Sequence, residues 1–195
     1  MGHDILTPRL RLRPWREADL SELLELFATP EVWHFPLRRG FTNDETRSFL
    51  WRMMEQHDAG IPCPFAAEDR RSSQLVGYIG LSVPHFLPEV MPSVEIGWRL
   101  GPIHWGQGLA TEGARAVLAY AFETLELDEL ISIYEPSNES SGRVMQRIGM
   151  RFDRDTTYPD GGPPLRIYRL TRHAWVLGAP SDVEHQCRGV EAESS

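Results

Sequence analysis

The stretch from Val94 to Phe122, VEIGWRLGPIHWGQGLATEGARAVLAYAF, decides the fold of this chain. An apolar strand runs into a glycine-rich turn, and the turn opens a long helix. Gly106 and Gly108 leave the backbone of the turn unshielded, and Ala110 keeps the next position small. Exposed N–H groups at a helix N-terminus bind anions, because the helix dipole reinforces them. The turn therefore predicts a cradle for the phosphates of a ligand.

The same glycine turn has three alternative interpretations. A P-loop requires a Gly-Lys-Ser/Thr sequence, which the turn lacks. A Rossmann fingerprint needs a third glycine at the position of Thr111, and also a strand at the start of the chain that leads directly into the loop. An ordinary glycine-rich turn that binds no ligand is the simplest alternative.

The rest of the chain predicts the elements around this stretch. Alternation of apolar residues favours strands over residues 9–13, 63–68, 75–83, 94–100, 130–134, 150–157 and 165–170. Apolar residues at helical spacing, with capping residues, favour helices over 17–28, 42–60, 109–125 and 139–148. A doubly wound fold would alternate strands and helices throughout. The observed order instead predicts an α+β fold with a largely antiparallel sheet and one central βαβ unit.

Length and composition predict the organisation of the chain and its compartment. Its 195 residues fit one domain, expected over 1–177, with a polar and disordered tail over 178–195. No apolar run approaches the roughly 18 residues of a membrane helix, and the start of the chain lacks a signal-peptide pattern. Only Cys63 and Cys187 are present, so we expect no disulfide framework and a cytoplasmic protein.

Charge and histidine spacing indicate which ligands to expect. The net charge of −8 argues against a nucleic-acid binder and favours a cationic partner such as an amine. The seven histidines are scattered, and the chain contains no HExxH or CxxC motif. We therefore predict no metal site.

Several motifs in the same order resemble one known family. The run WGQGLATE at residues 105–112 resembles the W-G-K-G-Y-A-T-E signature of GNAT acetyltransferases, in the branch that contains the ribosomal-protein N-terminal acetyltransferases. The run NESSGRVMQRIGM at 138–150 is similar to that branch's N-x-x-S-x-R-V-L-E-K-x-G-F. The opening TPRLRLRPWREAD and the closing Tyr168-Arg169-Leu170 also resemble its ends, so the resemblance covers roughly residues 5 to 175.

The resemblance implies a fold and a co-substrate. The fold is the GNAT acyl-CoA N-acyltransferase fold, in which about four helices flank a mixed, mostly antiparallel sheet of six to seven strands, splayed at the fourth strand near Val94 to Leu100. The co-substrate is acetyl-CoA, which enters the splay and places its pyrophosphate on the glycine turn. The implied acetyl-CoA-binding residues are Trp98, Leu100, Gln107, Gly108, Leu109, Ala110, Thr111, Asn138, Ser141 and Arg143.

The family mechanism is direct attack of an amine on the thioester, which needs a base for the amine and a proton for the leaving thiolate. Glu95 on the splayed strand is the candidate base, although alternation does not settle which face it occupies. His85 and Glu89, on the connection over 84–92, are weaker alternatives. Many GNAT enzymes use a tyrosine acid where this chain has Met145, which cannot donate a proton. Protonation therefore falls to Ser141, to water, or to Tyr134 if that residue faces the site.

The predicted function is an acetyl-CoA-dependent N-acetyltransferase that acts on a primary amine, either a small molecule or a peptide N-terminus. A homodimer is possible on the family pattern. The acceptor pocket is expected between the first two helices and the segments 84–92 and 158–164, with aromatic candidates at Trp33, His34, Phe35 and Trp51. One alternative is an acyl-CoA-binding sensor or subunit with little catalysis, and another is a nucleotide-binding regulator.

Overall fold

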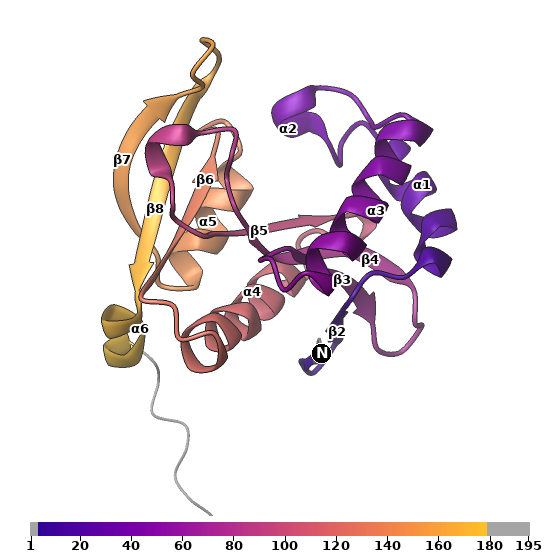
Figure 1. Cartoon of the computed structure of the whole chain (residues 1–195), viewed down its shortest axis with the longest axis horizontal. Coiled ribbons are helices and arrows are strands. Elements are labelled where there is room, and N and C mark those ends of the chain that lie inside the picture. Colours follow the sequence, from indigo (N-terminus) through magenta and orange to yellow (C-terminus); the bar gives the residue numbers. More distant parts are fainter. Residues whose placement is uncertain (1–3, 179–195) are drawn as a thin grey trace, which may run out of the picture.

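The computed structural model describes residues 4–178, and the predicted tail lies almost entirely outside this range. One mixed sheet contains all the strands, in the order β1-β2-β3-β4-β5-β6-β8-β7 (Figure 1). The strands are β1 (Ile5–Leu6), β2 (Leu10–Arg13), β3 (Pro64–Asp69), β4 (Leu75–Ser82), β5 (Glu95–Leu100), β6 (Glu129–Tyr134), β7 (Arg151–Thr157) and β8 (Pro164–Thr171). Every neighbouring pair is antiparallel except β5 and β6.

Helices cover both faces of the sheet. They are α1 (Leu20–Ala28), α2 (His34–Leu37), α3 (Asn43–Asp58), α4 (Leu109–Ala119), α5 (Glu139–Arg147) and α6 (Arg172–Gly178). Phe27 of α1 and Leu50 of α3 pack with Ala66 on one face. Val117 of α4 and Met145 of α5 pack on the opposite face, in the larger apolar core. The two faces of the sheet are therefore covered by different helix pairs, each with its own apolar cluster.

The parallel pair β5 and β6 separates after its first residues. Its only strand pairing joins Glu95 to Ile131. Just beyond, the Ser132 hydroxyl donates to the carbonyl oxygen of Ile96 at 2.8 Å, where a second backbone bond would otherwise lie. Since β5 and β6 run in the same direction and α4 links them, this is the predicted βαβ unit, and the sheet splays at the predicted strand.

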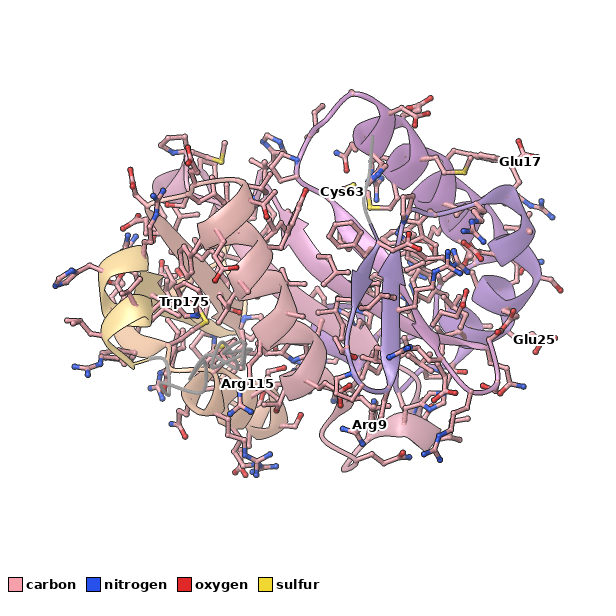
Figure 2. All side chains as sticks on the ribbon, turned by 90° about the horizontal axis from the view of Figure 1, so that it is seen from below. Arg9, Glu17, Glu25, Cys63, Arg115 and Trp175 are labelled. Carbon is pink, nitrogen blue, oxygen red and sulfur yellow. The ribbon has the colours of Figure 1, made fainter. Side chains whose placement is uncertain are left out.

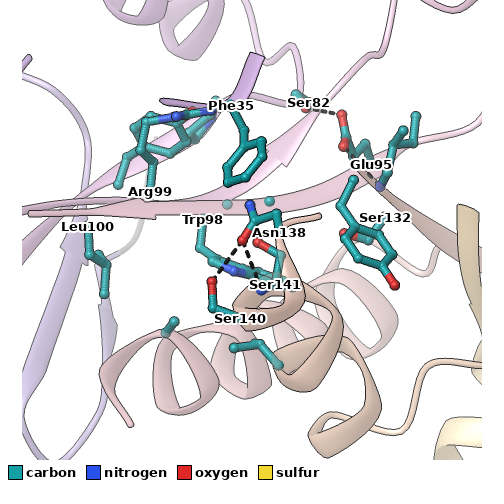
Figure 3. A pocket seen from close by; sticks show the side chains of 18 of the residues that line it. Phe35, Ser82, Glu95, Trp98, Arg99, Leu100, Ser132, Asn138, Ser140 and Ser141 are labelled. Atoms are coloured by element: carbon teal, nitrogen blue, oxygen red, sulfur yellow. Dashed lines mark hydrogen bonds between the residues drawn. The ribbon is translucent and has the colours of Figure 1, made fainter. Parts of the chain in front are cut away.

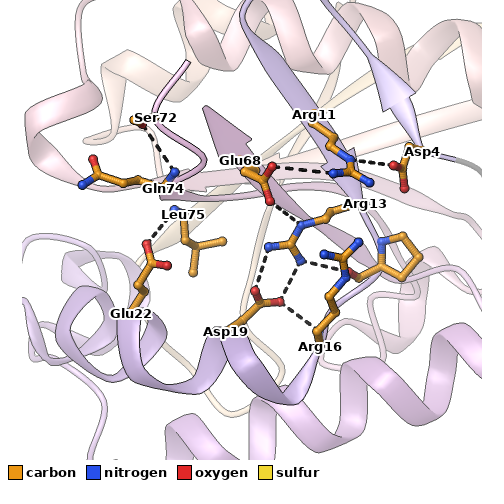
Figure 4. A network of polar contacts seen from close by, with 11 residues as sticks. Asp4, Arg11, Arg13, Arg16, Asp19, Glu22, Glu68, Ser72, Gln74 and Leu75 are labelled. Carbon is orange, nitrogen blue, oxygen red and sulfur yellow. Dashed lines mark hydrogen bonds and ion pairs between the residues drawn. The ribbon is translucent and has the colours of Figure 1, made fainter. Parts of the chain in front are cut away.

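A buried ionic network fixes the N-terminal part of the sheet to α1 (Figure 4). The Arg13 guanidinium donates two bonds to Asp19, at 2.7 and 2.8 Å, and a third to Glu68 at 2.7 Å. Asp19 also accepts from the backbone N–H of Arg16, the N-cap of the 3-10 turn η1 (Glu17–Asp19) that leads into α1. These carboxylates raise the pKa of Arg13 well above its ordinary value, chiefly through the bonds that its guanidinium donates to Asp19. The network is fully paired, so it orients α1 without leaving a buried charge alone.

The α+β architecture predicted from the sequence is confirmed, with small differences at the edges. The two-residue strand β1 adds an eighth strand, and the short helices α2 and α6 add to the four predicted ones. The end of the long helix is a π-helical turn, η4 (Tyr120–Thr124). Trp175 of α6 lies against Phe122 of that turn, with ring centroids 5.4 Å apart (Figure 2). Within the described residues, no helix is long and apolar enough to span a membrane.

Candidate active site

A cavity of about 1150 Å³ occupies the opening between β5 and β6. The glycine turn and the first turns of α4 and α5 line one side, as the close view in Figure 3 shows in part. The residues after β4 and the segment around α2 line the other side. One continuous space therefore joins the predicted phosphate cradle to the predicted acceptor region.

The glycine turn holds the backbone as the sequence predicts. Gly106 and Gly108 have φ of +72° and +79°, the left-handed region that other residues rarely adopt. Gly108 is the N-cap of α4, and no side chain caps this end. The first backbone bond of the helix runs from Glu112 N–H to Gly108 C=O, so the N–H groups of Leu109, Ala110 and Thr111 have no acceptor inside the helix. This end of α4 fits an anionic group.

An ion pair between Arg9 and Glu112 supports the glycine turn. The Glu112 carboxylate accepts from the Thr7 hydroxyl at 2.6 Å and from the backbone N–H and side chain of Arg9 at 2.8 and 2.6 Å. Arg9 in turn donates to the carbonyl oxygen of Gln107 at 2.8 Å. The side chain of Gln107 reaches back to the Ile103 carbonyl, and Gln107 does not line the cavity. Its predicted contact with the co-substrate therefore rests on its backbone N–H alone.

Backbone N–H and C=O groups of β5 point into the opening between β5 and β6. The Val94 carbonyl accepts from Ile131 N–H at 3.0 Å, and the Ile96 carbonyl accepts from Ser132, so even-numbered residues turn their backbone toward β6. Because backbone direction alternates along a strand, the N–H and C=O of Trp98 point into this opening. Trp98 lines the cavity, so its N–H is available to a carbonyl oxygen.

The backbone of Leu100 also points toward β6, but its carbonyl group already has a hydrogen-bond donor. Its carbonyl accepts from the indole N–H of Trp105 at 2.7 Å. This bond anchors the glycine turn to the end of β5. Leu100 therefore contributes its side chain to the cavity lining, and its carbonyl is already paired. The signature tryptophan, Trp105, acts as a positioning residue that the sequence pattern alone did not explain.

The N-terminus of α5 brings three polar side chains to the same space (Figure 3). Asn138 caps the helix as predicted, accepting from Ser141 N–H at 3.4 Å. It also accepts from the Ser140 hydroxyl at 2.7 Å, a contact that the sequence did not single out. Arg143 lines the cavity but is largely exposed and pairs with Glu139 at 3.0 Å. Ser141 also lines the cavity.

Glu95 lies on the face of β5 opposite α4, which settles the face that alternation left open. Its neighbours Ile96 and Leu100 pack in the core toward α4, so Glu95 and Arg99 occupy the opposite face. Its carboxylate accepts from Ile133 N–H at 3.3 Å and from the Ser82 hydroxyl at 3.4 Å. Burial raises the pKa of Glu95 to about 7, and these two bonds offset the shift only partly. A carboxylate with this pKa suits proton transfer near neutral pH.

Met145 stands where the resemblance would place a tyrosine acid, and its side chain is buried in the apolar core. Tyr134 lines the cavity and packs against Gly142 of α5, where a Cβ atom would lie 2.9 Å from the tyrosine hydroxyl oxygen. Burial raises the pKa of Tyr134, so its hydroxyl stays protonated at neutral pH. Ser141 and Tyr134 both remain candidate acids.

The residues considered for the acceptor pocket divide into two groups. His34, Phe35 and His85 line the cavity, whereas Trp33, Trp51 and Glu89 do not. Trp33 is buried, stacking on Phe41 with a centroid separation of 3.8 Å, and Trp51 faces outward from α3. Glu89 lies 3.6 Å from Arg154 in an exposed ion pair, so it has no place in the site. Within residues 4–178, no cluster of three or more His, Cys, Asp or Glu is arranged to hold a metal ion.

Comparisons with known proteins identify the family. The family model described as the acetyltransferase (GNAT) domain matches residues 9–151. The chain is 30% identical to the uncharacterized protein YkkB of Bacillus subtilis over 84% of this chain and 93% of that protein. It is 29% identical to the uncharacterized N-acetyltransferase YnaD of the same organism, over 75% and 82%. A GNAT-family acetyltransferase from Bacillus anthracis superposes with a TM-score of 0.74 and 26% identity, over 88% of this chain and 99% of that one.

The chain therefore belongs to the GNAT acetyltransferase family and has the GNAT fold. This confirms the resemblance inferred from the motifs at residues 105–112 and 138–150. The family supports acetyl transfer from acetyl-CoA as the class of reaction.

Proposed function

We propose that this protein is an acetyl-CoA-dependent N-acetyltransferase whose acceptor is a primary amine, either a small molecule or a peptide N-terminus. One observation carries the proposal: a single cavity joins the free N–H groups of α4, the exposed backbone of β5 and the carboxylate of Glu95. These are the parts that phosphate binding, carbonyl polarisation and amine deprotonation require.

The residues divide the binding of the co-substrate among them. The N–H groups of the turn from Gln107 to Thr111 would hold the pyrophosphate. Asn138 would contact the pantetheine arm, and Arg143 would lie near the same end of the cavity. The left-handed glycines keep side chains away from this surface. Bound acetyl-CoA supplies the thioester carbonyl carbon that the amine attacks.

The protein's own groups would then move the protons. Glu95 takes a proton from the acceptor ammonium, through a water molecule, to give the free amine. The Trp98 N–H donates to the carbonyl oxygen of the thioester as negative charge develops there. The new bond joins the amine nitrogen to the acetyl carbon, and the carbon–sulfur bond breaks. Ser141 or Tyr134 donates a proton to the leaving thiolate and regains one, through solvent, from the nitrogen of the tetrahedral intermediate, which leaves a neutral amide and a free thiol.

Release of free thiol from acetyl-CoA, followed with a thiol reagent over a panel of primary amines, tests the proposal. The proposal predicts amine-dependent thiol release that saturates with the amine. A binding sensor or subunit would bind acetyl-CoA equally well but release no thiol above the background with any amine. A panel that includes peptides with free and blocked N-termini separates peptide acceptors from small-molecule ones.

Replacing Ser141 by alanine tests the assignment of the acid. Ser141→Ala should lower kcat by about ten-fold and leave the acetyl-CoA dissociation constant within about two-fold, because the hydroxyl acts mainly on the developing thiolate. Ser21→Ala is the matched control, since Ser21 is an exposed serine in the first turn of α1, outside the cavity. An unchanged kcat in Ser141→Ala would leave Ser141 with only its place in the first turn of α5.

A further inference from the structure

A second carboxylate, that of Glu135, lines the cavity near Glu95. Its side chain is only 2% exposed. One carboxylate oxygen, Oε2, accepts from the Arg38 guanidinium. The other, Oε1, is buried and has no hydrogen-bond partner in the described part of the chain. A buried carboxylate oxygen without a donor is costly, so this position calls for a donor that the fold itself does not supply.

Strand geometry places Glu135 on the same wall as Glu95. Ile131 and Ile133 of β6 both pack on the acceptor face of the sheet, and Glu135 is the next residue in that alternating series. The Glu95 carboxylate meets β6 at the N–H of Ile133, so Glu135 lies two residues farther along. Two strand residues span about 6–7 Å. Tyr158 lies close to both carboxylates, since each contributes to raising its pKa, after the larger effect of burial.

Arg38 reaches Glu135 from the opposite side of the opening. It follows α2 directly, and its guanidinium lies 4.7 Å from the centre of the Phe35 ring. The Arg38 side chain is 44% exposed, whereas that of Glu135 is buried. Arg38 also donates to the His34 carbonyl at 2.9 Å. Its departure would leave the buried Glu135 charge alone, so Arg38 moves into solvent only where another cation takes its place. Glu135 would then face the cavity with both oxygens.

The other arginine of this region, Arg99, has a different environment. It donates to the Tyr78 hydroxyl at 3.0 Å and to the Val32 carbonyl, and its guanidinium lies 3.9 Å from the centre of the Trp33 ring. Two of its three guanidinium nitrogens and one face of the guanidinium are therefore engaged by the fold. In the acceptor part of the cavity, the atom that lacks a partner is Oε1 of Glu135. This oxygen calls for a positively charged hydrogen-bond donor and not for an anion.

Resting on the proposed function, we propose that Glu135 binds a second cationic group of the acceptor and that Arg38 occupies this position when no acceptor is bound. Glu95 faces the reacting ammonium, and Glu135 faces an ammonium or guanidinium farther along the same molecule. The chemical class of acceptor is thus an amine with a second positive charge, of which a linear diamine is the simplest example. The charge-assisted bond to Glu135 makes this residue a specificity determinant.

The test compares linear α,ω-diamines of three to six carbons with n-alkylamines of the same lengths. For the wild-type protein, kcat/KM for at least one diamine should exceed that of its matched monoamine by about ten-fold or more, which corresponds to one charge-assisted contact. Glu135→Gln should remove most of this preference, because the loss in kcat/KM is larger for the diamine than for the matched monoamine. Arg38→Ala should lower KM for the diamine, because it removes the competing guanidinium. Glu89→Gln, an exposed carboxylate outside the cavity, is the matched control.

Calorimetric titration of the same diamine into protein saturated with CoA keeps this inference separate from catalysis. Diamine binding that is lost in Glu135→Gln but kept in Glu89→Gln supports the inference even if no amine is acetylated, in which case only the proposed function fails. Acetylation without diamine preference, or an equal loss for diamine and monoamine in Glu135→Gln, overturns the inference and leaves the proposed function intact. A preference for amino acids over diamines would overturn it as well.

Discussion

Gly108→Val should weaken acetyl-CoA binding by at least about ten-fold. Gly108 has a φ of +79° at the N-cap of α4, and a valine there would be strained and would project a branched side chain over the free N–H groups. In the protein itself, a Cβ atom at this position meets only Arg9, at 3.7 Å. The loss should therefore fall on the ligand more than on packing. Calorimetric titration with acetyl-CoA measures it directly.

Gly60→Val is the matched control for the backbone strain. Gly60 has a φ of +69° after α3, a Cβ atom there meets nothing within 4 Å, and the residue lies outside the cavity. Both variants should lose stability to a similar degree, but only Gly108→Val should lose affinity. If Gly108→Val folds and binds acetyl-CoA as tightly as the wild type, the turn is not the phosphate cradle.

Glu95→Gln should lower kcat by about 100-fold or more, the size expected for loss of a general base. The acetyl-CoA dissociation constant should change little, because the carboxylate lies on the acceptor side of β5. The isosteric amide retains bonds with Ser82 and keeps the shape of the cavity wall. Thiol release at saturating amine, measured beside acetyl-CoA titrations, separates the two effects.

The pH dependence gives this prediction a second readout. Because the pKa of Glu95 is raised to about 7, the ionised and active base accumulates as pH rises through that value. The wild-type kcat should therefore rise with pH and level off with a midpoint near pH 7. This rise of kcat with pH should be absent in Glu95→Gln. If Glu95→Gln keeps both the wild-type kcat and its rise with pH, another group, or solvent, deprotonates the amine.

Much of the fold was accessible from sequence, because its signals are local. The glycines at 106 and 108, the cap at Asn138 and the alternating strands each depend on neighbours within a few residues. The order of these signals was enough for the α+β class, whereas the splayed strand followed from the family resemblance. The eighth strand was missed because two residues, Ile5 and Leu6, carry no periodicity.

The parts that could not be predicted depend on contacts between distant segments. Arg38 and Glu135 are 97 positions apart, and no local pattern marks either residue. The face of Glu95 followed only once the core packing of its neighbours was known. Trp105 matched a family signature, but its bond to the Leu100 carbonyl required the course of the turn. Long-range pairing of this kind is set by the assembled sheet and not by the sequence near each residue.

The most direct test of the central claim is a thermal-shift series with acetyl-CoA, CoA, ATP and NAD at equal concentrations. A ligand that binds only the folded state raises Tm by mass action, by an amount that grows with its affinity. The structure predicts that acetyl-CoA and CoA raise Tm and that ATP and NAD do not. No shift with acetyl-CoA or CoA, or an equal shift with ATP, would contradict the assignment of this cavity as an acetyl-CoA site.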